Sequence, residues 1–279
     1  MTNFLVQWGV NPWGEDTLIH AQWGLVYVAF AFGLGFMVAH TLFVRFWPKP
    51  AEPAAAPLND MATRVPARVA RHSLAARMFH WIMAASMLTL LGTASAPVLG
   101  LNFNWIEIHW IAGLVLTASI VYHIIHASVW LDFWSIWLNK EDVNEATTRF
   151  KRAMGRSAPA PRKAAKYPWD NKMYHTAIVL SALASVPTGL FMMTRVETPL
   201  FVRNPYLFSD TTWGVMYVLH GLSGIGLVGL TISHVYFAIR PEKRWITKGM
   251  IFGDISRQDF LRHHDPDRWI IDTHAHDEV

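Results

Sequence analysis

The sequence contains no cysteine and few charged residues for its length. Without cysteine the chain cannot hold a thiolate-bound iron–sulfur cluster or a covalently attached c-type haem, both of which need that side chain. Charged residues make up 16% of the 279 positions, whereas hydrophobic residues make up 52%. This balance is typical of an integral membrane protein.

Charge is absent altogether from five long stretches. They are residues 17–44, 78–106, 108–131, 173–194 and 211–239. Each can supply the roughly 20 residues that a membrane-spanning helix needs. We therefore predict an all-α integral membrane protein with five transmembrane helices, at about 18–46, 74–98, 105–136, 172–194 and 211–240.

The basic residues are confined to alternate connections between these helices. Three segments, which begin at Arg45, Lys140 and Arg240, hold 22 of the 24 Lys and Arg residues. By the positive-inside rule the amino terminus lies outside and the carboxyl terminus inside, as in a multi-pass protein of the bacterial inner membrane. The basic pI thus reflects topology, and nucleic-acid binding is not expected. The first helix is too long for a signal peptide and lacks its basic start, so we expect it to be retained.

The chain is organised as three parts. Residues 1–60 form a peripheral helix followed by a Pro/Ala-rich linker, 61–240 form a four-helix bundle, and 241–279 form a cytoplasmic tail. Within the bundle the sequence repeats, which makes helices two–three and four–five two copies of one hairpin related by a pseudo-two-fold axis. The matching positions are Arg77–His80 with Lys172–His175, Ser86 with Ser181, Leu88 with Leu183, and His109, Gly113, Leu116 and His123 with His220, Gly224, Leu227 and His234.

Two of the predicted helices each carry a pair of histidines 14 residues apart, His109 with His123 and His220 with His234. Fourteen residues span about 21 Å of helix and return to nearly the same face. A lone histidine in a membrane commonly lines a polar cavity, but a duplicated two-tier pattern is what a bundle needs to hold stacked haems. Since cysteine is absent, these must be b-type haems.

Further residues would support such haems. The second ring nitrogen of each ligand should bond a carbonyl or hydroxyl group. Candidate hydroxyls in the bundle are those of Ser86, Thr117, Ser119, Ser181, Ser223 and Ser233. Candidate cations for the haem propionates, or equally for lipid headgroups, are Arg71, Arg77, Lys172 and Arg240.

Four segments carry a resemblance to a known family. They are Arg77 to Trp81, His109 to Gly113, the loop from Lys166 to Met173, and His220 to Tyr236. Over about residues 70–270 the chain resembles the dihaem cytochrome b membrane (gamma) subunits of respiratory formate dehydrogenases, which are related to cytochrome b subunits of nickel–iron hydrogenases and thiosulfate reductases.

The resemblance implies which histidines bind haem iron. It places an outer haem between His109 and His220 and an inner haem between His80 and His234. Two histidines, His123 and His175, depart from the family pattern. Under the repeat, the His80–His234 pair maps onto His175–His123, so a third haem or an alternative inner ligand set stays open. A rival scheme pairs His123 directly with His234.

The resemblance also implies a quinone and protein partners. The loop before helix four borders a quinone pocket in that family, which here makes Tyr167, Asp170 and Asn171 the candidate quinone contacts; Pro168 replaces the family's asparagine. An iron–sulfur subunit and a molybdenum, tungsten or nickel–iron catalytic subunit would carry the primary catalysis. This chain would pass electrons between them and the quinone pool.

Two other functions are compatible with parts of the pattern. A standalone b561-like electron carrier would use the same haems without a stable complex. A transporter with a histidine relay would suit the repeat, but intramembrane carboxylates other than Glu107 and broken helices other than at Pro187 are missing.

Overall fold

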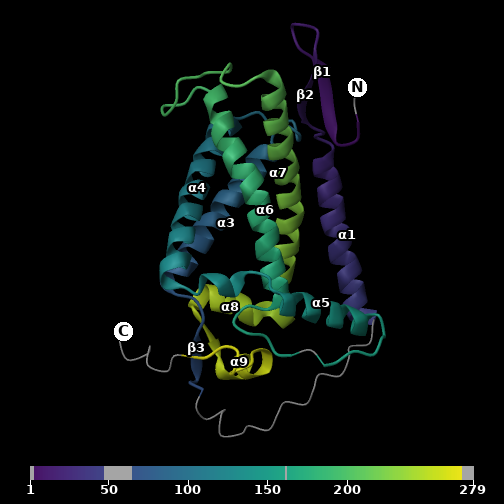
Figure 1. The fold of residues 1–279 in the computed structure, drawn as a ribbon, viewed down its shortest axis with the longest axis vertical. Helices are drawn as coiled ribbons and strands as arrows, with labels where there is room; N and C mark the ends of the chain where they lie inside the picture. Colours follow the sequence, from purple (N-terminus) through teal and green to yellow (C-terminus); the bar gives the residue numbers. More distant parts are fainter. Residues whose placement is uncertain (1–2, 47–64, 161, 272–279) are drawn as a thin grey trace. The chain divides into compact units, whose positions relative to one another are not determined.

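The computed structural model describes residues 3–46, 65–160 and 162–271. The predicted Pro/Ala-rich linker, which ends at residue 60, falls within residues 47–64; these residues and the last eight lie outside the described part of the chain. The helices and strands are β1 (Val6–Val10), β2 (Asp16–Ala21), α1 (Leu25–Phe46), β3 (Arg68–Ala70), α3 (Leu74–Ser95), α4 (Trp105–Trp130), η1 (Phe133–Ile136), α5 (Lys140–Ala153), α6 (Trp169–Met192), η2 (Met193–Arg195), α7 (Asp210–Ile239), η3 (Pro241–Lys243), α8 (Arg244–Phe252), β4 (Asp254–Ser256) and α9 (Arg257–His263) (Figure 1).

Five helices are long and apolar enough to cross a membrane, as the sequence predicts. They are α1, α3, α4, α6 continued by η2 to Arg195, and α7. Their surfaces expose large apolar side chains, such as Phe32 at 77% and Leu183 at 66%, which suits contact with lipid rather than water. The chain is thus mostly helical and multi-pass.

The first spanning helix begins later than predicted, at Leu25 instead of residue 18. The preceding apolar residues form β2, which pairs antiparallel with β1 through a bulge between Gln7 and Trp8. At the turn, the side-chain oxygen of Asn11 accepts hydrogen bonds from the backbone N–H groups of Trp13 (3.1 Å) and Glu15 (2.9 Å). The all-α prediction is therefore wrong for this hairpin, because a short apolar run does not distinguish a strand from a helix.

The described residues divide into two compact units. Unit 1 comprises residues 1–39, 79–125 and 177–235, and unit 2 comprises 40–78, 126–176 and 236–279. In unit 1, the first helix and its hairpin pack on α7 where glycines allow close approach. A Cβ atom on Gly33 would lie 3.0–3.3 Å from Ile232, and one on Gly221 would lie 3.0 Å from Ala21.

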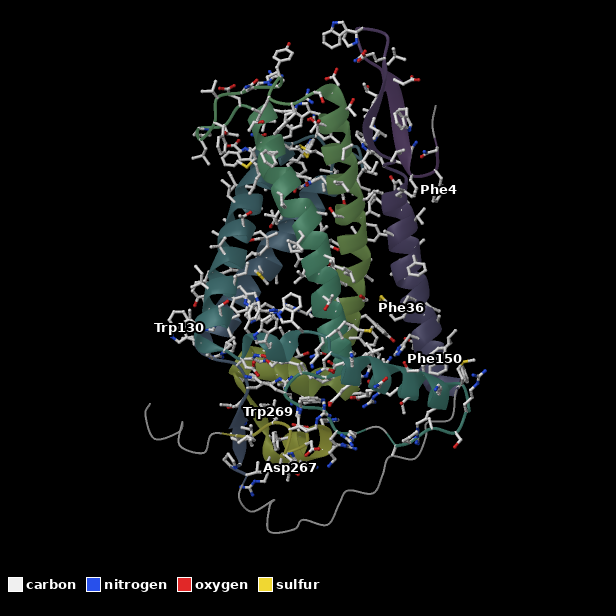
Figure 2. The ribbon with its side chains drawn as sticks, in the orientation of Figure 1. Phe4, Phe36, Trp130, Phe150, Asp267 and Trp269 are labelled. Atoms are coloured by element: carbon white, nitrogen blue, oxygen red, sulfur yellow. The ribbon has the colours of Figure 1, made fainter. Side chains whose placement is uncertain are left out.

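Unit 2 contains the small core of the folded tail. Val65, Val69, Ile255 and Phe260 are buried together, with Trp269, which Figure 2 labels, packed against them. Strand β3 pairs antiparallel with β4, which ties residues 68–70 to residues 254–256. Much of the stretch from residue 241 to 271 is therefore folded structure.

A buried arginine fastens this tail to the rest of unit 2. Arg71 is 3% exposed; it donates hydrogen bonds to His264 Nε2 (3.1 Å) and to the Lys166 carbonyl (3.1 Å). Its guanidinium also lies over the rings of Trp245 and Trp269, at 5.2 and 5.4 Å. Burial lowers the pKa of Arg71 to about 10, which leaves it cationic at neutral pH.

Candidate functional site

Two histidines predicted to share a haem face each other in unit 1. His109 on α4 and His220 on α7 have ring centres 6.2 Å apart, with planes inclined by 69°. The pair lies in the half of each helix nearer its N-terminus, four residues into α4 and ten into α7.

A threonine on α3 sets the tautomer of His109. The Thr93 hydroxyl donates its single proton to the backbone carbonyls of Thr89 (2.7 Å) and Leu90 (3.0 Å). Its oxygen lies 2.8 Å from His109 Nδ1 and is therefore left to accept. Nδ1 must then carry the ring proton, so the lone pair of Nε2 is available to a metal.

The same arrangement occurs at His220. The Thr188 hydroxyl on α6 donates to the carbonyls of Ala184 (2.5 Å) and Ser185 (3.1 Å), and it lies 3.1 Å from His220 Nδ1. His220 Nδ1 is also 3.0 Å from the Ser185 carbonyl, which can only accept. Both contacts place the proton on Nδ1 and leave Nε2 as the metal-binding nitrogen.

These contacts correct the predicted hydrogen-bond partners of the two histidines. The acceptors are Thr93, Thr188 and a backbone carbonyl, whereas four of the six expected hydroxyls donate to backbone carbonyls. Thr117 donates to the Gly113 carbonyl and Ser233 to the Leu230 carbonyl. The missed residues do carry a signal, because Thr93 and Thr188 are 95 positions apart, the offset that also separates His80 from His175.

A second histidine pair lies in the same unit. His80 on α3 and His234 on α7 have ring centres 6.3 Å apart, with planes inclined by 52°. His234 is 14 residues beyond His220 on α7, about 21 Å along the helix axis. Two imidazole pairs of nearly equal separation therefore occupy two levels of unit 1.

The separation of each pair fits one iron atom held between two imidazoles. A metal–imidazole bond is about 2.0–2.1 Å long, and a ring nitrogen lies about 1.1 Å from the centre of its ring. Ring centres on opposite sides of one iron are then about 6.2–6.4 Å apart. Among the described residues no group of three or more His, Cys, Asp or Glu could hold a bare metal ion. A two-ligand site suits iron whose other ligands come from a porphyrin.

The glycines near the His109–His220 pair leave space for such a flat group. A Cβ atom on Gly224 would meet no atom within 4 Å, and one on Gly113 would meet only Leu90 at 3.9 Å. Gly189 is different, because a Cβ there would lie 3.0 Å from the His220 ring itself. Gly113 and Gly224 are the glycines that the repeat places one turn from each histidine.

The two additional histidines have aromatic neighbours. The ring centre of His123 lies 4.4 Å from that of Phe79 in unit 1. The ring centre of His175 lies 5.4 Å from that of Trp137 in unit 2, edge to face. Nδ1 of His175 is buried and makes no hydrogen bond to the described residues. Their roles as haem ligands stay a prediction.

The candidate quinone residues lie at the start of α6 in unit 2. Tyr167 is largely buried, and burial raises its pKa. Asp170 forms an ion pair with Lys243 at 2.7 Å. Asn171, partly buried, follows in the first turn of α6.

Each candidate propionate cation has a protein partner in unit 2. Lys172 pairs with Asp142 at 2.8 Å, Arg77 donates to the Ile251 carbonyl at 2.7 Å, and Arg240 bonds Glu242 and the Tyr236 hydroxyl, both at 2.7 Å. Arg71 bonds His264, as described above. These interactions stabilise unit 2 whether the cations also contact a haem propionate, a lipid headgroup or neither.

The comparison with known families agrees with a haem protein. No curated protein matches the chain. The sequence model of the prokaryotic cytochrome b561 family matches residues 71–253, about two-thirds of the chain, and covers all four paired histidines. That family consists of membrane cytochromes that bind b-type haem and transfer electrons. The chain belongs to the prokaryotic cytochrome b561 family.

Proposed function

We propose that this protein is the membrane cytochrome b subunit of a respiratory oxidoreductase, of the formate dehydrogenase, thiosulfate reductase or hydrogenase kind. It passes electrons between an iron–sulfur partner and the quinone pool. The observation that carries the proposal is the presence of two histidine pairs with ring centres 6.2 and 6.3 Å apart at two levels of unit 1. Haem iron held by both histidines of each pair would supply one-electron transfer and would leave no position for substrate chemistry.

We assign two haems per chain. His109 and His220 hold the first, and His80 and His234 hold the second; when bound, these groups supply one-electron chemistry. The protein's own contribution is to orient the imidazoles, and Thr93 and Thr188 do so for the first pair through the hydrogen bonds to Nδ1.

The repeated hairpin gives this arrangement its symmetry. Thr93 and His109 in the first copy correspond to Thr188 and His220 in the second, and each threonine bonds the histidine of its own copy. This equivalence supports a bundle in which α3–α4 and α6–α7 are two copies of one unit. It also favours a first haem near the pseudo-two-fold axis.

The quinone is proposed to bind beside the first turn of α6. Tyr167 offers a buried hydroxyl, and Asn171 offers an amide that can bond a quinone oxygen. Quinone reduction consumes protons, and the basic segments that flank this region predict that they come from the cytoplasm. The direction of electron flow depends on the potential of the partner.

The partner itself is inferred from what this chain lacks. Cysteine is absent, so the chain holds no iron–sulfur cluster, and catalysis on the primary substrate needs another subunit. A standalone electron carrier is the second candidate, because membership of the cytochrome b561 family implies electron transfer without specifying a complex.

Spectroscopy and purification test these proposals in order. A reduced-minus-oxidised spectrum of the purified chain should show b-type haem, and pyridine haemochrome should give two haems per polypeptide. A ratio near three would replace the two-haem assignment by one that includes His123 and His175.

The quinone and partner are tested in membranes. Added quinol should reduce the haems of the reconstituted chain, and the Asn171→Leu variant should slow that reduction several-fold while the haem content stays unchanged. Isolation from native membranes in mild detergent should recover an iron–sulfur subunit. Recovery of the cytochrome alone, with full quinol reactivity, would favour the standalone carrier.

A further inference from the structure

Helix α5 in unit 2 exposes a narrow apolar stripe. Val143, Thr147, Phe150 and Met154 follow one another at intervals of three or four residues, so they lie on one side of the helix and its C-cap. Val143 is 57% exposed, Phe150 68% and Met154 61% (Figure 2 labels Phe150). These side chains are too exposed to belong to the core of unit 2. The rest of the helix is mostly polar, so the apolar stripe is a distinct feature of it.

The start of α5 is held at the level where α6 enters the membrane. Asp142, in the first turn of α5, pairs with Lys172 at 2.8 Å, and both side chains are buried. Lys172 is the fourth residue of a membrane-spanning helix. A reciprocal capping box between Asn139 and Asp142 fixes the same turn. The helix therefore starts at the height of the lipid headgroups.

Basic side chains flank the stripe on one side. At about 100° per residue, Lys140 and Lys151 lie about 60° and 80° round the helix from Val143. Both are exposed, and neither forms an ion pair with any described residue. Lysines in this position can extend their charge to lipid phosphates while their stems cover apolar surface.

We propose that α5 lies in the headgroup layer of the membrane, with Val143, Phe150 and Met154 inserted at the acyl boundary and with Lys140 and Lys151 on anionic phospholipid phosphates. The occupant of the stripe is thus lipid. Lipid contact accounts for the exposed apolar side chains, the unpaired lysines and the height of the helix together, whereas a protein partner would account only for the first. The proposal depends on the membrane topology and not on the identity of the electron-transfer partner.

Cysteine labelling provides the test, because the chain has no cysteine of its own. Phe150→Cys and, independently, Met154→Cys are labelled with a polarity-sensitive fluorophore. The full haem-loaded chain is then reconstituted in vesicles of phosphatidylcholine with or without phosphatidylglycerol. Both labels should emit at shorter wavelength than in water, and spin-labelled lipids should quench them from a depth of about 5–10 Å below the headgroups.

Two controls distinguish lipid contact from burial of the label against protein. A label at Asn144→Cys, an exposed position about 100° round the same helix from Val143, should stay in a watery environment. Phosphatidylglycerol should deepen the label at position 150, and a Lys140→Gln/Lys151→Gln variant should lose that effect. Water-like emission at both 150 and 154 in both kinds of vesicle would overturn the proposal and would indicate a surface reserved for a protein.

Discussion

Removing the hydroxyl of Thr93 tests the first haem site most directly. In Thr93→Val the side chain keeps its shape but can no longer accept the hydrogen bond from His109 Nδ1, which is 2.8 Å long. That bond increases the electron density of the imidazole and so stabilises the oxidised iron over the reduced iron. We therefore expect the midpoint potential of one haem to rise.

The size of the shift follows from the strength of one buried hydrogen bond. Such a bond contributes about 1 kcal/mol, and a one-electron couple changes by about 59 mV for each tenfold change in equilibrium constant. If the full free energy of this bond stabilised only the oxidised haem, its removal would raise the midpoint potential by about 40 mV. Thr188→Val should act in the same direction but less strongly, because His220 keeps the Ser185 carbonyl at 3.0 Å.

Potentiometric titration of the haem absorbance resolves the two redox steps. Since His109 and His220 are assigned to one iron, both variants must shift the same step, and the double variant should shift it by about the sum. Thr89→Val, one turn away on α3, is the matched control, because its hydroxyl donates only to the Ala85 carbonyl at 2.9 Å. Shifts in two different steps would refute the pairing, and an unchanged potential would refute the role of the hydroxyl.

Three other predictions concern stability. Burial and the neighbouring Arg71 guanidinium lower the pKa of His264 to about 4. As the pH falls below about 6.5, this histidine therefore binds a proton in the unfolded chain before it does so in the folded chain. Stability should decrease from pH 6.5 to about 4, by on the order of 3 kcal/mol in total; protease cleavage of the tail should accelerate accordingly, and a His264→Gln variant should lack this dependence. Asp142→Asn should lower the free energy of unfolding by about 3–5 kcal/mol, since it leaves Lys172 charged and buried, and Asp142→Leu/Lys172→Met should recover most of the loss in thermal denaturation. Gly33→Ala should cost about 1–3 kcal/mol in the same assay by overpacking, whereas Gly35→Ala, which meets open space, should cost nothing or stabilise.

The spanning helices could be predicted because their physical signal is strong. A bilayer requires about 20 uncharged residues in succession, and few other structures produce that pattern. The hairpin of β1 and β2 could not be predicted in the same way, because its pairing depends on the turn at Asn11 and on contacts with α7. Asn11 Nδ2, for example, bonds Asp210 at 3.3 Å. Such long-range contacts produce no periodic pattern in the sequence from which they could be predicted.

The site residues were predictable to different degrees. The candidate haem-binding histidines stand out because ionisable side chains are rare within apolar helices. Thr93 and Thr188 match each other in the repeat but do not stand out by residue type, since a threonine in a membrane helix commonly bonds its own backbone, as both of these also do. Only the geometry across two helices shows that the same oxygen also accepts from a histidine.

The two histidine levels differ in whether equivalent residues of the two repeat copies make the same contacts. At the first level the symmetry is kept, because Thr93–His109 and Thr188–His220 are equivalent contacts. At the second level His80 faces His234 at 6.3 Å and also lies 5.3 Å from the ring of Trp81, whereas the aromatic rings beside the equivalent histidines lie 4.4 Å from His123 and 5.4 Å from His175. The ring beside His175 belongs to Trp137.

Trp137 comes from the connection that follows α4, and the repeat offers no aromatic counterpart for it: the position matching Trp137 after α7 is Lys248. The ring beside His175 therefore comes from a connection, whereas the ring beside His123 belongs to Phe79 on α3, within the hairpin itself. Among the described residues the ring of His175 contacts Trp137 and no second imidazole, whereas His80 faces His234, so the lack of a paired imidazole disfavours a bis-histidine site at His175. We expect His175→Leu to leave the haem content at two per polypeptide while His80→Leu reduces it to one, and equal losses from both variants would restore the symmetric three-haem arrangement.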